Sequence, residues 1–205
     1  MAYSFDVDLD DIRHGLRTFD TSYFQAPGRM NVFDEHPFKV ILDYGHNPAA
    51  MNAMAGLADR LDVKGKRIVV VSIPGDRRDV DVDDAARTIA GRFDHFICKA
   101  DDNRRKRAHD EIPNLFKAAL MSHGVSKDQI SVIPDEEDAV AASLELAKSG
   151  DLVIIFGDNS ARCWKQIIYF NAPDQDAQPT TASVIVPPPV PFEDMNDGDL
   201  GLVRD

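Results

Sequence analysis

Short apolar runs, each followed by a polar turn and then by a helical segment, recur through most of this chain. The runs Phe38 to Leu42, Arg67 to Ile73 and Leu152 to Phe156 are continuous and rich in β-branched residues, which is typical of strands buried on both faces. Alternating strands and helices with right-handed crossovers predict a mostly parallel sheet covered by helices on both sides. We therefore expect an α/β fold of three layers.

Two segments precede the regular alternation. Leu9 to Phe19 carries apolar residues at helical spacing and is predicted to form a single helix, either the end of a missing domain or an appendage that packs on the body. Met30 to Phe33 and Phe38 to Leu42 flank a short turn and are predicted to pair as a hairpin. The fold class is then a Rossmann-like, mostly parallel sheet with an antiparallel edge hairpin. A later helix is predicted over Asp83 to Phe93.

Composition excludes several classes of protein. No apolar run approaches the roughly 20 residues of a membrane span, and the N-terminus lacks the pattern of a secretion signal, so we expect a cytoplasmic protein with no membrane partner. A net charge of -12 argues against a nucleic-acid partner, because phosphate backbones need clustered Lys and Arg. Cys98 and Cys163 are far apart in the sequence and are expected to be reduced, and we predict no metal site in this chain.

The pattern stops after Phe170. Residues 171–205 contain Pro187-Pro188-Pro189, scattered acidic residues and little periodicity, which predicts a disordered, acidic, Pro-rich tail. The expected organisation is therefore an N-terminal segment over 1–25, a body over 26–170 and a tail over 171–205.

The turn from Asp43 to Pro48 is the strongest candidate for a ligand site. Asn47 is a good N-cap and Pro48 suits the first helical position, so a helix N-terminus with free N–H groups is expected to face the end of the strand. That end of a helix favours phosphate or carboxylate. Asp43 and His46 add groups for ribose hydroxyls, phosphate oxygens or a metal-bound water. The alternative is an ordinary turn whose Asp and Asn only cap the backbone.

Basic residues gather in two later loops of this otherwise acidic chain. The first loop holds Arg77 and Arg78, and the second runs from Asp101 to Arg107. Both follow predicted strands, so they are expected to meet the Asp43 turn at the carboxyl edge of the sheet, where open α/β folds bind ligands. A locally basic site suits a small anionic ligand.

Four motifs occur in a characteristic order along the chain. They are Pro27-Gly28-Arg29, Asp43-Tyr44-Gly45-His46-Asn47-Pro48, Gly75-Asp76-Arg77-Arg78-Asp79 and Asp101-Asp102-Asn103-Arg104. With these motifs the sequence resembles the C-terminal domain of the Mur ligase family over Leu9 to Phe170, and within that family it is most similar to the muramyl-ligase-like module of cyanophycin synthetases. The resemblance implies that residues 1–25 are the end of a central ATPase domain.

The resemblance implies a ligase that uses ATP and Mg²⁺ to join a carboxylate acceptor to an amine through an acyl phosphate. Such chemistry requires charge neutralisation on the phosphoryl group and exclusion of water. Carried over, Arg29 would reach the ATP phosphates, Asp43 the ribose hydroxyls, and His46 and Asn47 would lie beside the phosphates, with Arg29 and His46 taking part in catalysis. Otherwise, Arg29 is a surface arginine after a Pro-Gly turn.

The resemblance also places recognition of the incoming amino acid, arginine or aspartate, in the loop Asp101 to Arg107. For arginine, Asp101 and Asp102 would pair with its guanidinium, and Arg104, next to Asn103, would hold its α-carboxylate. Arg77 and Arg78 would contact substrate or phosphate. The alternatives are a solvated charged loop and a surface pair that balances Asp76 and Asp79.

Two departures from the family pattern limit the expected activity. No G-x-x-x-x-G-K-[ST] motif is present, so the chain is expected to be catalytically incomplete and to need a separate P-loop domain, which would supply most Mg²⁺ ligands. Gly157-Asp158-Asn159 replaces the Gly-Lys-Gly-His pattern of peptidoglycan-type members, which argues against a substrate from peptidoglycan synthesis. The alternative function is a non-catalytic interaction module, or a decayed remnant that keeps the fold.

Overall fold

The computed structural model of the 205-residue chain describes residues 5–19 and 22–171. The predicted tail therefore lies outside the described residues, except for Asn171.

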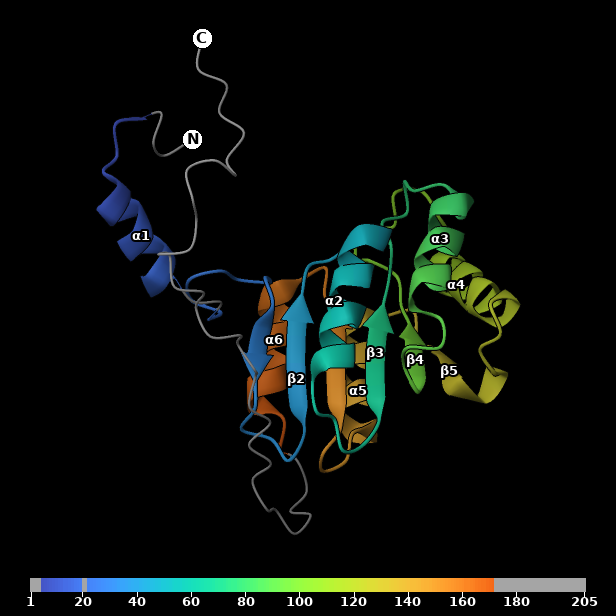
Figure 1. Ribbon diagram of the computed structural model, residues 1–205. Helices are drawn as coiled ribbons and strands as arrows, with labels where there is room; N and C mark the ends of the chain where they lie inside the picture. The colour runs from blue at the N-terminus through green and yellow to red at the C-terminus, as the bar shows by residue number, and fades with distance from the viewer. Residues whose placement is uncertain (1–4, 20–21, 172–205) are drawn as a thin grey trace.

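A single sheet of six strands forms the middle layer, in the order β1-β2-β6-β3-β4-β5 (Figure 1). The first pair is antiparallel and every other neighbouring pair is parallel. This arrangement confirms the predicted mostly parallel sheet with an antiparallel edge hairpin. The strands are β1 (Asn31–Phe33), β2 (Lys39–Asp43), β3 (Arg67–Val71), β4 (His95–Cys98), β5 (Ile130–Val132) and β6 (Leu152–Phe156).

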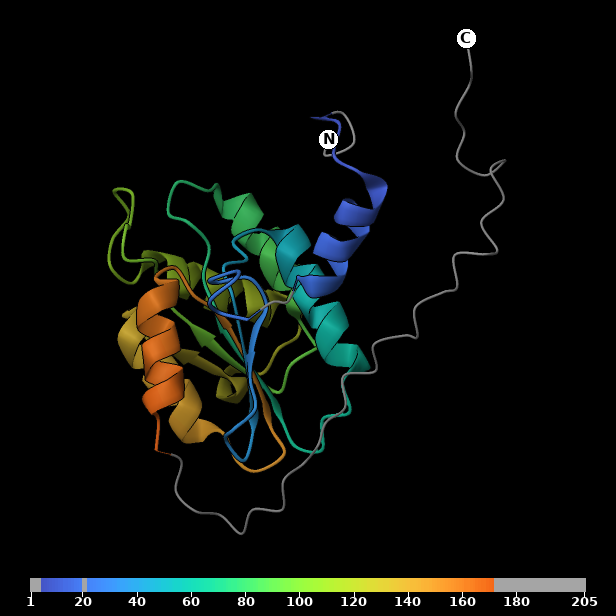
Figure 2. The ribbon, with the colours of Figure 1, turned by 90° about the vertical axis from the view of Figure 1, so that its left-hand side faces the viewer.

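Helices cover both faces of the sheet and make the outer two layers (Figure 2). One face packs against α2 (Pro48–Arg60), α3 (Asp79–Ile89) and α4 (Glu111–Ser122). The other face packs against α5 (Glu136–Leu146) and α6 (Ser160–Tyr169).

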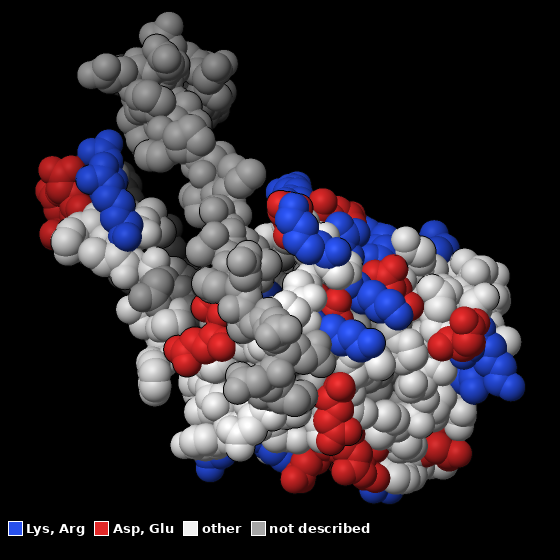
Figure 3. All heavy atoms as spheres, turned by 90° about the horizontal axis from the view of Figure 1, so that it is seen from below, with Lys and Arg blue, Asp and Glu red and all other residues white. Residues whose placement is uncertain are grey.

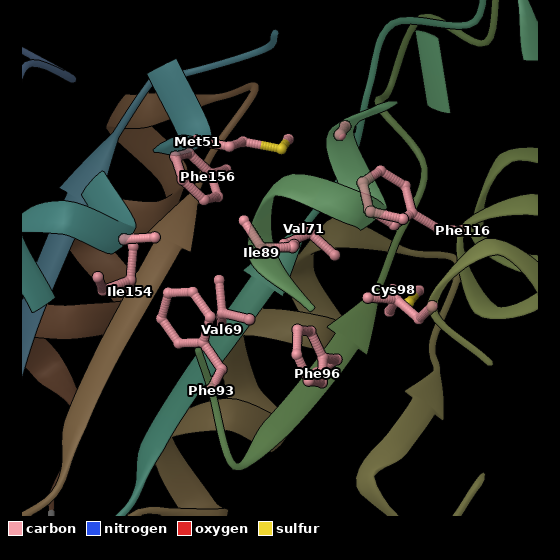
Figure 4. Packing of buried hydrophobic residues seen from close by; sticks show 14 of the residues in the cluster. Met51, Val69, Val71, Ile89, Phe93, Phe96, Cys98, Phe116, Ile154 and Phe156 are labelled. Carbon is pink, nitrogen blue, oxygen red and sulfur yellow. The ribbon is translucent and has the colours of Figure 1, made fainter. Parts of the chain in front are cut away.

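Alternating side chains of the central strands feed two separate cores. Val69 and Val71 of β3 point to the side of α2, α3 and α4, whereas Ile68 and Val70 point to the side of α5 and α6. Figure 4 shows the core between the sheet and helices α2, α3 and α4, to which Phe116 of α4 belongs. Because all four of these β3 residues are 0% exposed, the strand reads in the sequence as a continuous apolar run.

The third helix begins earlier than predicted, at Asp79 rather than Asp83. Arg78 precedes it, and the Asp81 carboxylate accepts a hydrogen bond from the Arg78 backbone N–H at 3.1 Å and from the Arg78 guanidinium. This capping arrangement starts the helix directly after the loop that holds Arg77 and Arg78.

Helix α1 (Leu9–Thr18) buries none of its residues, and Figure 1 shows it beside the α/β body. Leu16 is 75% exposed and Phe19, just after the helix, is 58% exposed. The assignment of residues 1–25 to the end of a preceding domain stays a prediction.

The two ends of the sheet differ in what they carry. The loops that follow β2, β3, β4 and β6 all leave the carboxyl ends of parallel strands, at the upper end of the sheet in Figure 1. On the opposite end, seen in Figure 3, acidic and basic side chains are interspersed over the uncovered surface. The predicted site residues belong to the carboxyl end. Within the described ranges, no helix has the length and apolar content needed to cross a membrane.

Candidate functional site

Asp43 ends β2 and holds two loops together. Its Oδ1 accepts a hydrogen bond from the Gly45 N–H at 2.7 Å, and its Oδ2 accepts one from the Met30 N–H at 2.9 Å. The carboxylate therefore joins the segment before β1 to the turn after β2. Each oxygen keeps a second lone pair, so Asp43 can still accept hydrogen bonds from the hydroxyls of a ligand.

His46 and Asn47 have fixed orientations in the same turn. His46 Nδ1 lies 3.0 Å from the Tyr44 carbonyl oxygen, which can only accept, so Nδ1 carries the hydrogen and Nε2 of the neutral ring is left as an acceptor. Asn47 Oδ1 accepts from the Ala50 N–H at 2.9 Å and caps α2 as predicted. Because Pro48 has no N–H and the cap uses that of Ala50, the N–H groups of Asn47 and Ala49 are the donors that this end of α2 has left for an anion.

Arg29 lies over the ring of Tyr44, with its guanidinium carbon 5.4 Å from the ring centroid. Its side chain is exposed and makes no ion pair with any described residue. Gly28 fixes its position, because this glycine is buried at a φ of +69° and an added Cβ would collide with Ser160 at the start of α6. The Tyr44 N–H donates to the Gly28 carbonyl at 2.8 Å. Arg29 is thus a cation held beside the Asp43 turn and open to a ligand.

A buried ion pair lies beneath the loops. The Lys99 side chain is 0% exposed, directly after β4, and its Nζ lies 2.9 Å from Oε2 of Glu136, which is also 0% exposed. Glu136 Oε2 accepts from the Asp158 N–H at 2.6 Å, and its Oε1 accepts from the Asn159 N–H at 3.0 Å. One carboxylate of α5 therefore holds the loop after β6 and neutralises the lysine of β4.

The pair shifts the pKa of both partners. Burial alone would raise the pKa of the Glu136 carboxyl, but Lys99 and the two backbone N–H groups lower it to about 2. Burial alone would lower the pKa of Lys99, but the carboxylates of Glu136 and Asp101 raise it above its usual value. Both groups are charged at neutral pH.

Acid is expected to destabilise the protein through Glu136. The pKa of this carboxyl is 4.5 when unperturbed and about 2 in the fold, so its contribution to stability is complete above the first value and is lost as the pH falls through the second. We expect the urea midpoint of the wild type to fall over this range more steeply than that of Glu136→Gln. Parallel profiles would contradict the expectation.

Asp102 already has a guanidinium partner within the chain. Arg162 of α6 donates to its two carboxylate oxygens at 2.9 and 2.8 Å, and also to Glu136 Oε1 at 2.6 Å. This geometry is the bidentate pairing that the sequence had suggested for a substrate guanidinium. In the structure Asp102 anchors its loop to α6, whereas Asp101 lies beside Lys99, with Oδ1 at 3.4 Å from Nζ.

The two basic loops lie against each other at the ends of β3 and β4. Arg107 joins them, because its guanidinium donates to the Gly75 carbonyl at 3.0 Å and to the Arg77 carbonyl at 2.7 Å. Arg78 is engaged with Asp81, as described above. The side chains of Arg77 and Arg104 are exposed and make no hydrogen bond or ion pair with a described residue, although the charge of Arg77 acts on Asp81. Asn103 Oδ1 accepts from the Arg105 N–H at 3.2 Å.

Sequence reasoning missed Lys99, Glu136 and Arg162. Lys99 is a charged residue at the end of an otherwise apolar run, and that position was the one available signal, since lysines are almost never fully buried unless paired. Glu136 looked like an ordinary acidic residue in the first turn of a helix. Arg162 gave no signal, because its partner Asp102 is 60 positions away.

Comparison with known proteins identifies the family. The family described as "Mur ligase, glutamate ligase domain" matches residues 28–159. A cyanophycin synthetase from Crocosphaera subtropica is 37% identical over 161 residues, which are 78% of this chain and 18% of that protein. A UDP-N-acetylmuramoyl-L-alanyl-D-glutamate--2,6-diaminopimelate ligase from Aquifex aeolicus is 30% identical over 176 residues, which are 84% of this chain and 33% of that protein.

Solved structures share the fold. FolC from E. coli, in complex with DHPP and ADP, superimposes with a TM-score of 0.59 at 21% identity, over 79% of this chain and 34% of that one. The chain spans about a fifth of the length of the cyanophycin synthetases that it matches. Because the family match covers more than half of the chain, the protein belongs to the Mur ligase family and carries its C-terminal domain.

Proposed function

We propose that this domain binds ATP and the incoming amino acid for an ATP-dependent, amide-forming ligase of the cyanophycin-synthetase type. The observation that carries the proposal is Arg29, an exposed cation without an ion pair among the described residues, held over Tyr44 beside Asp43 and His46. When bound, ATP with Mg²⁺ would supply the phosphoryl group that activates a carboxylate. The relatives named cyanophycin synthetase and diaminopimelate ligase support a substrate that is an amino acid.

The residues of the Asp43 turn fit a nucleotide. Arg29 would neutralise phosphate charge, and the free lone pairs of Asp43 would accept from ribose hydroxyls. His46 Nε2, the acceptor of the ring, would accept a hydrogen bond from a water beside the phosphates. The Asn47 cap and Pro48 together remove two of the four donors at the start of α2, so Arg29 rather than the helix end would carry most of the phosphate recognition. Within residues 5–19 and 22–171, no group of three or more His, Cys, Asp or Glu is arranged to hold a metal ion. We propose that the Mg²⁺ ligands come from a separate P-loop domain.

The loop after β4 would recognise the amino acid. Because Asp102 binds Arg162, its part would be to hold the loop, and Asp101, Arg104 and Arg77 would be the groups available to the ligand. Exposed guanidinium groups suit the α-carboxylate of an amino acid. The chain alone would bind its ligands but not complete the reaction.

Mg-ATP binding is expected to depend on Arg29. Removing one charge-assisted contact from a phosphate costs about 1.5–3 kcal/mol, so Arg29→Ala should weaken binding by about ten-fold or more in calorimetric titration. Arg60→Ala is the matched control, since Arg60 is an exposed arginine at the far end of α2. Equal affinities for the two variants, or no binding by the wild type, would count against the proposed function and favour the non-catalytic interaction module.

A further inference from the structure

Ser72, the first residue after β3, has a buried hydroxyl without a partner. The residue is 3% exposed, and its Oγ makes no hydrogen bond to any described residue. Buried hydroxyls in folded proteins nearly always have a partner, because leaving one unmade costs free energy. The position of Ser72 therefore suggests that the missing partner comes from outside the chain.

Ser72 lines a small hollow between the ends of four strands. The hollow has a volume of about 10 Å³, and its walls include Gly45 and His46 after β2, Asp101 after β4 and Asp158 after β6. This volume has room for about one group of the size of a water molecule. The hollow suits a small group at one end of a ligand.

Negative charge is in excess around this hollow. The cluster around the hollow contains four carboxylates and two cations, which leaves two negative charges without a counter-charge. The carboxylates are those of Asp101, Asp102, Glu136 and Asp158, and the cations are Lys99 and Arg162. Arg162 is committed to Asp102 and Glu136, and Lys99 to Glu136. Burial and the nearby Asp101 charge raise the pKa of the Asp158 carboxyl, as expected where negative charge is not fully neutralised. A cationic group would restore the balance.

The hollow also lies between the two halves of the candidate site. His46 and Gly45 belong to the turn proposed to bind the nucleotide, and Asp101 begins the loop proposed to bind the amino acid. A group in this hollow would therefore be near both ligands. In an amide-forming reaction the group that must reach the activated carboxylate is the amine of the incoming substrate.

We infer that this hollow binds the primary amino group of the incoming substrate in its ammonium form, with Ser72 Oγ accepting one of its hydrogen bonds and Asp101 and Asp158 pairing with its charge. The inference rests on the proposed function, since it names the subsite in which the incoming amine binds. The ammonium would pass one proton to the carboxylate of Asp101 or Asp158, and the freed lone pair of its nitrogen would then attack the acyl phosphate and release phosphate. The hollow is small, has an excess of negative charge and offers the Ser72 hydroxyl as a free acceptor. An ammonium group matches these three properties, because it is small, cationic and only donates hydrogen bonds.

Methylammonium is the probe for this subsite, because it carries the ammonium group without a side chain. In ¹H–¹⁵N spectra of the full chain, we expect saturable shifts at the amides of Gly45, Ser72 and Asp158. Tetramethylammonium has the charge but no N–H donor and should leave these signals in place. Ser72→Ala and Asp158→Asn should each raise the dissociation constant by about ten-fold, as for the loss of a hydrogen bond to a charged group. The same spectra show whether each variant is folded.

Ser122→Ala and Asp128→Asn are the matched controls, because Ser122 is exposed at the end of α4 and Asp128 is exposed just before β5, at the amino end of the sheet. They should bind methylammonium as the wild type does. Absence of saturable shifts in the wild type, or binding that Ser72→Ala and Asp158→Asn leave unchanged, would overturn the inference. Mg-ATP titration of Arg29→Ala tests the proposed function separately, so failure of the amine subsite and failure of nucleotide binding are distinguishable.

Discussion

Replacing Glu136 with glutamine is expected to lower the free energy of unfolding by about 3–5 kcal/mol, the usual cost of removing one partner of a buried ion pair. The substitution keeps the size of the side chain but leaves the Lys99 ammonium, which is 0% exposed, without its closest counter-charge. Asp101 is the remaining carboxylate near Lys99, and at 3.4 Å it is too distant to replace the 2.9 Å contact. Urea unfolding followed by circular dichroism measures the loss.

Glu137→Gln is the matched control for this experiment. Glu137 is the next residue in the first turn of α5, and it is exposed and in no described ion pair. Its substitution should change stability by less than about 0.5 kcal/mol, as is usual for surface positions. If Glu136→Gln loses no more stability than this control, Lys99 is not held as an ion pair.

Replacing both partners tests what else Glu136 does. Apolar replacement of a complete buried ion pair is often neutral or stabilising. Here the double variant Lys99→Met with Glu136→Leu would also remove the acceptor of the Asp158 and Asn159 N–H groups. We therefore expect it to recover part of the lost stability and not all of it, because the loop after β6 would lose its hydrogen bonds.

The fold could be predicted because its signals are local. The apolar runs of β3 and β6 are continuous since both faces of each strand are buried, and the Asn47-Pro48 pair marks the start of α2. The meeting of the polar loops then follows from the parallel order of the strands. A departure from these predictions is the start of α3, where a capping interaction between Arg78 and Asp81 starts the helix at Asp79 rather than Asp83.

The pairing of side chains within the site could not be predicted in this way. The resemblance implied that Asp102 would pair with the guanidinium of an arginine substrate, whereas in the structure α6 places Arg162 against Asp102. The pair joins the loop after β4 to helix α6, and no period or motif in the sequence links them. The same holds for Lys99 and Glu136, which meet because β4 lies over α5 in the folded chain. The residues of the site could be named from motifs, while their partners depend on tertiary structure.

Replacing Gly75 with alanine is expected to displace the loop from Asp101 to Arg107. An added Cβ would collide with the carbonyl oxygen of Arg104 and lie 2.9 Å from its carbonyl carbon, and both atoms are backbone. The Arg107 guanidinium also holds the two loops together next to this contact, because it donates hydrogen bonds to the carbonyls of Gly75 and Arg77. The strain cannot be relieved by a change of rotamer, so the loop after β4 must move.

We expect Gly75→Ala to lower stability by about 1–3 kcal/mol, as for overpacking elsewhere in proteins, and to shift the amide signals of residues 101–107. If this loop recognises the amino acid, the displacement of the loop should also lower the affinity for L-arginine or L-aspartate, whereas the affinity for Mg-ATP at Arg29 should not change.

Gly15→Ala is the control, because an added Cβ at this position of α1 meets no atom within 4 Å, and alanine favours a helix by about 1 kcal/mol over glycine. Unchanged signals for residues 101–107 in Gly75→Ala would show that the close approach of the two loops does not set the shape of the site. A shifted loop with unchanged affinity for both amino acids would instead separate this loop from the recognition of these two substrates.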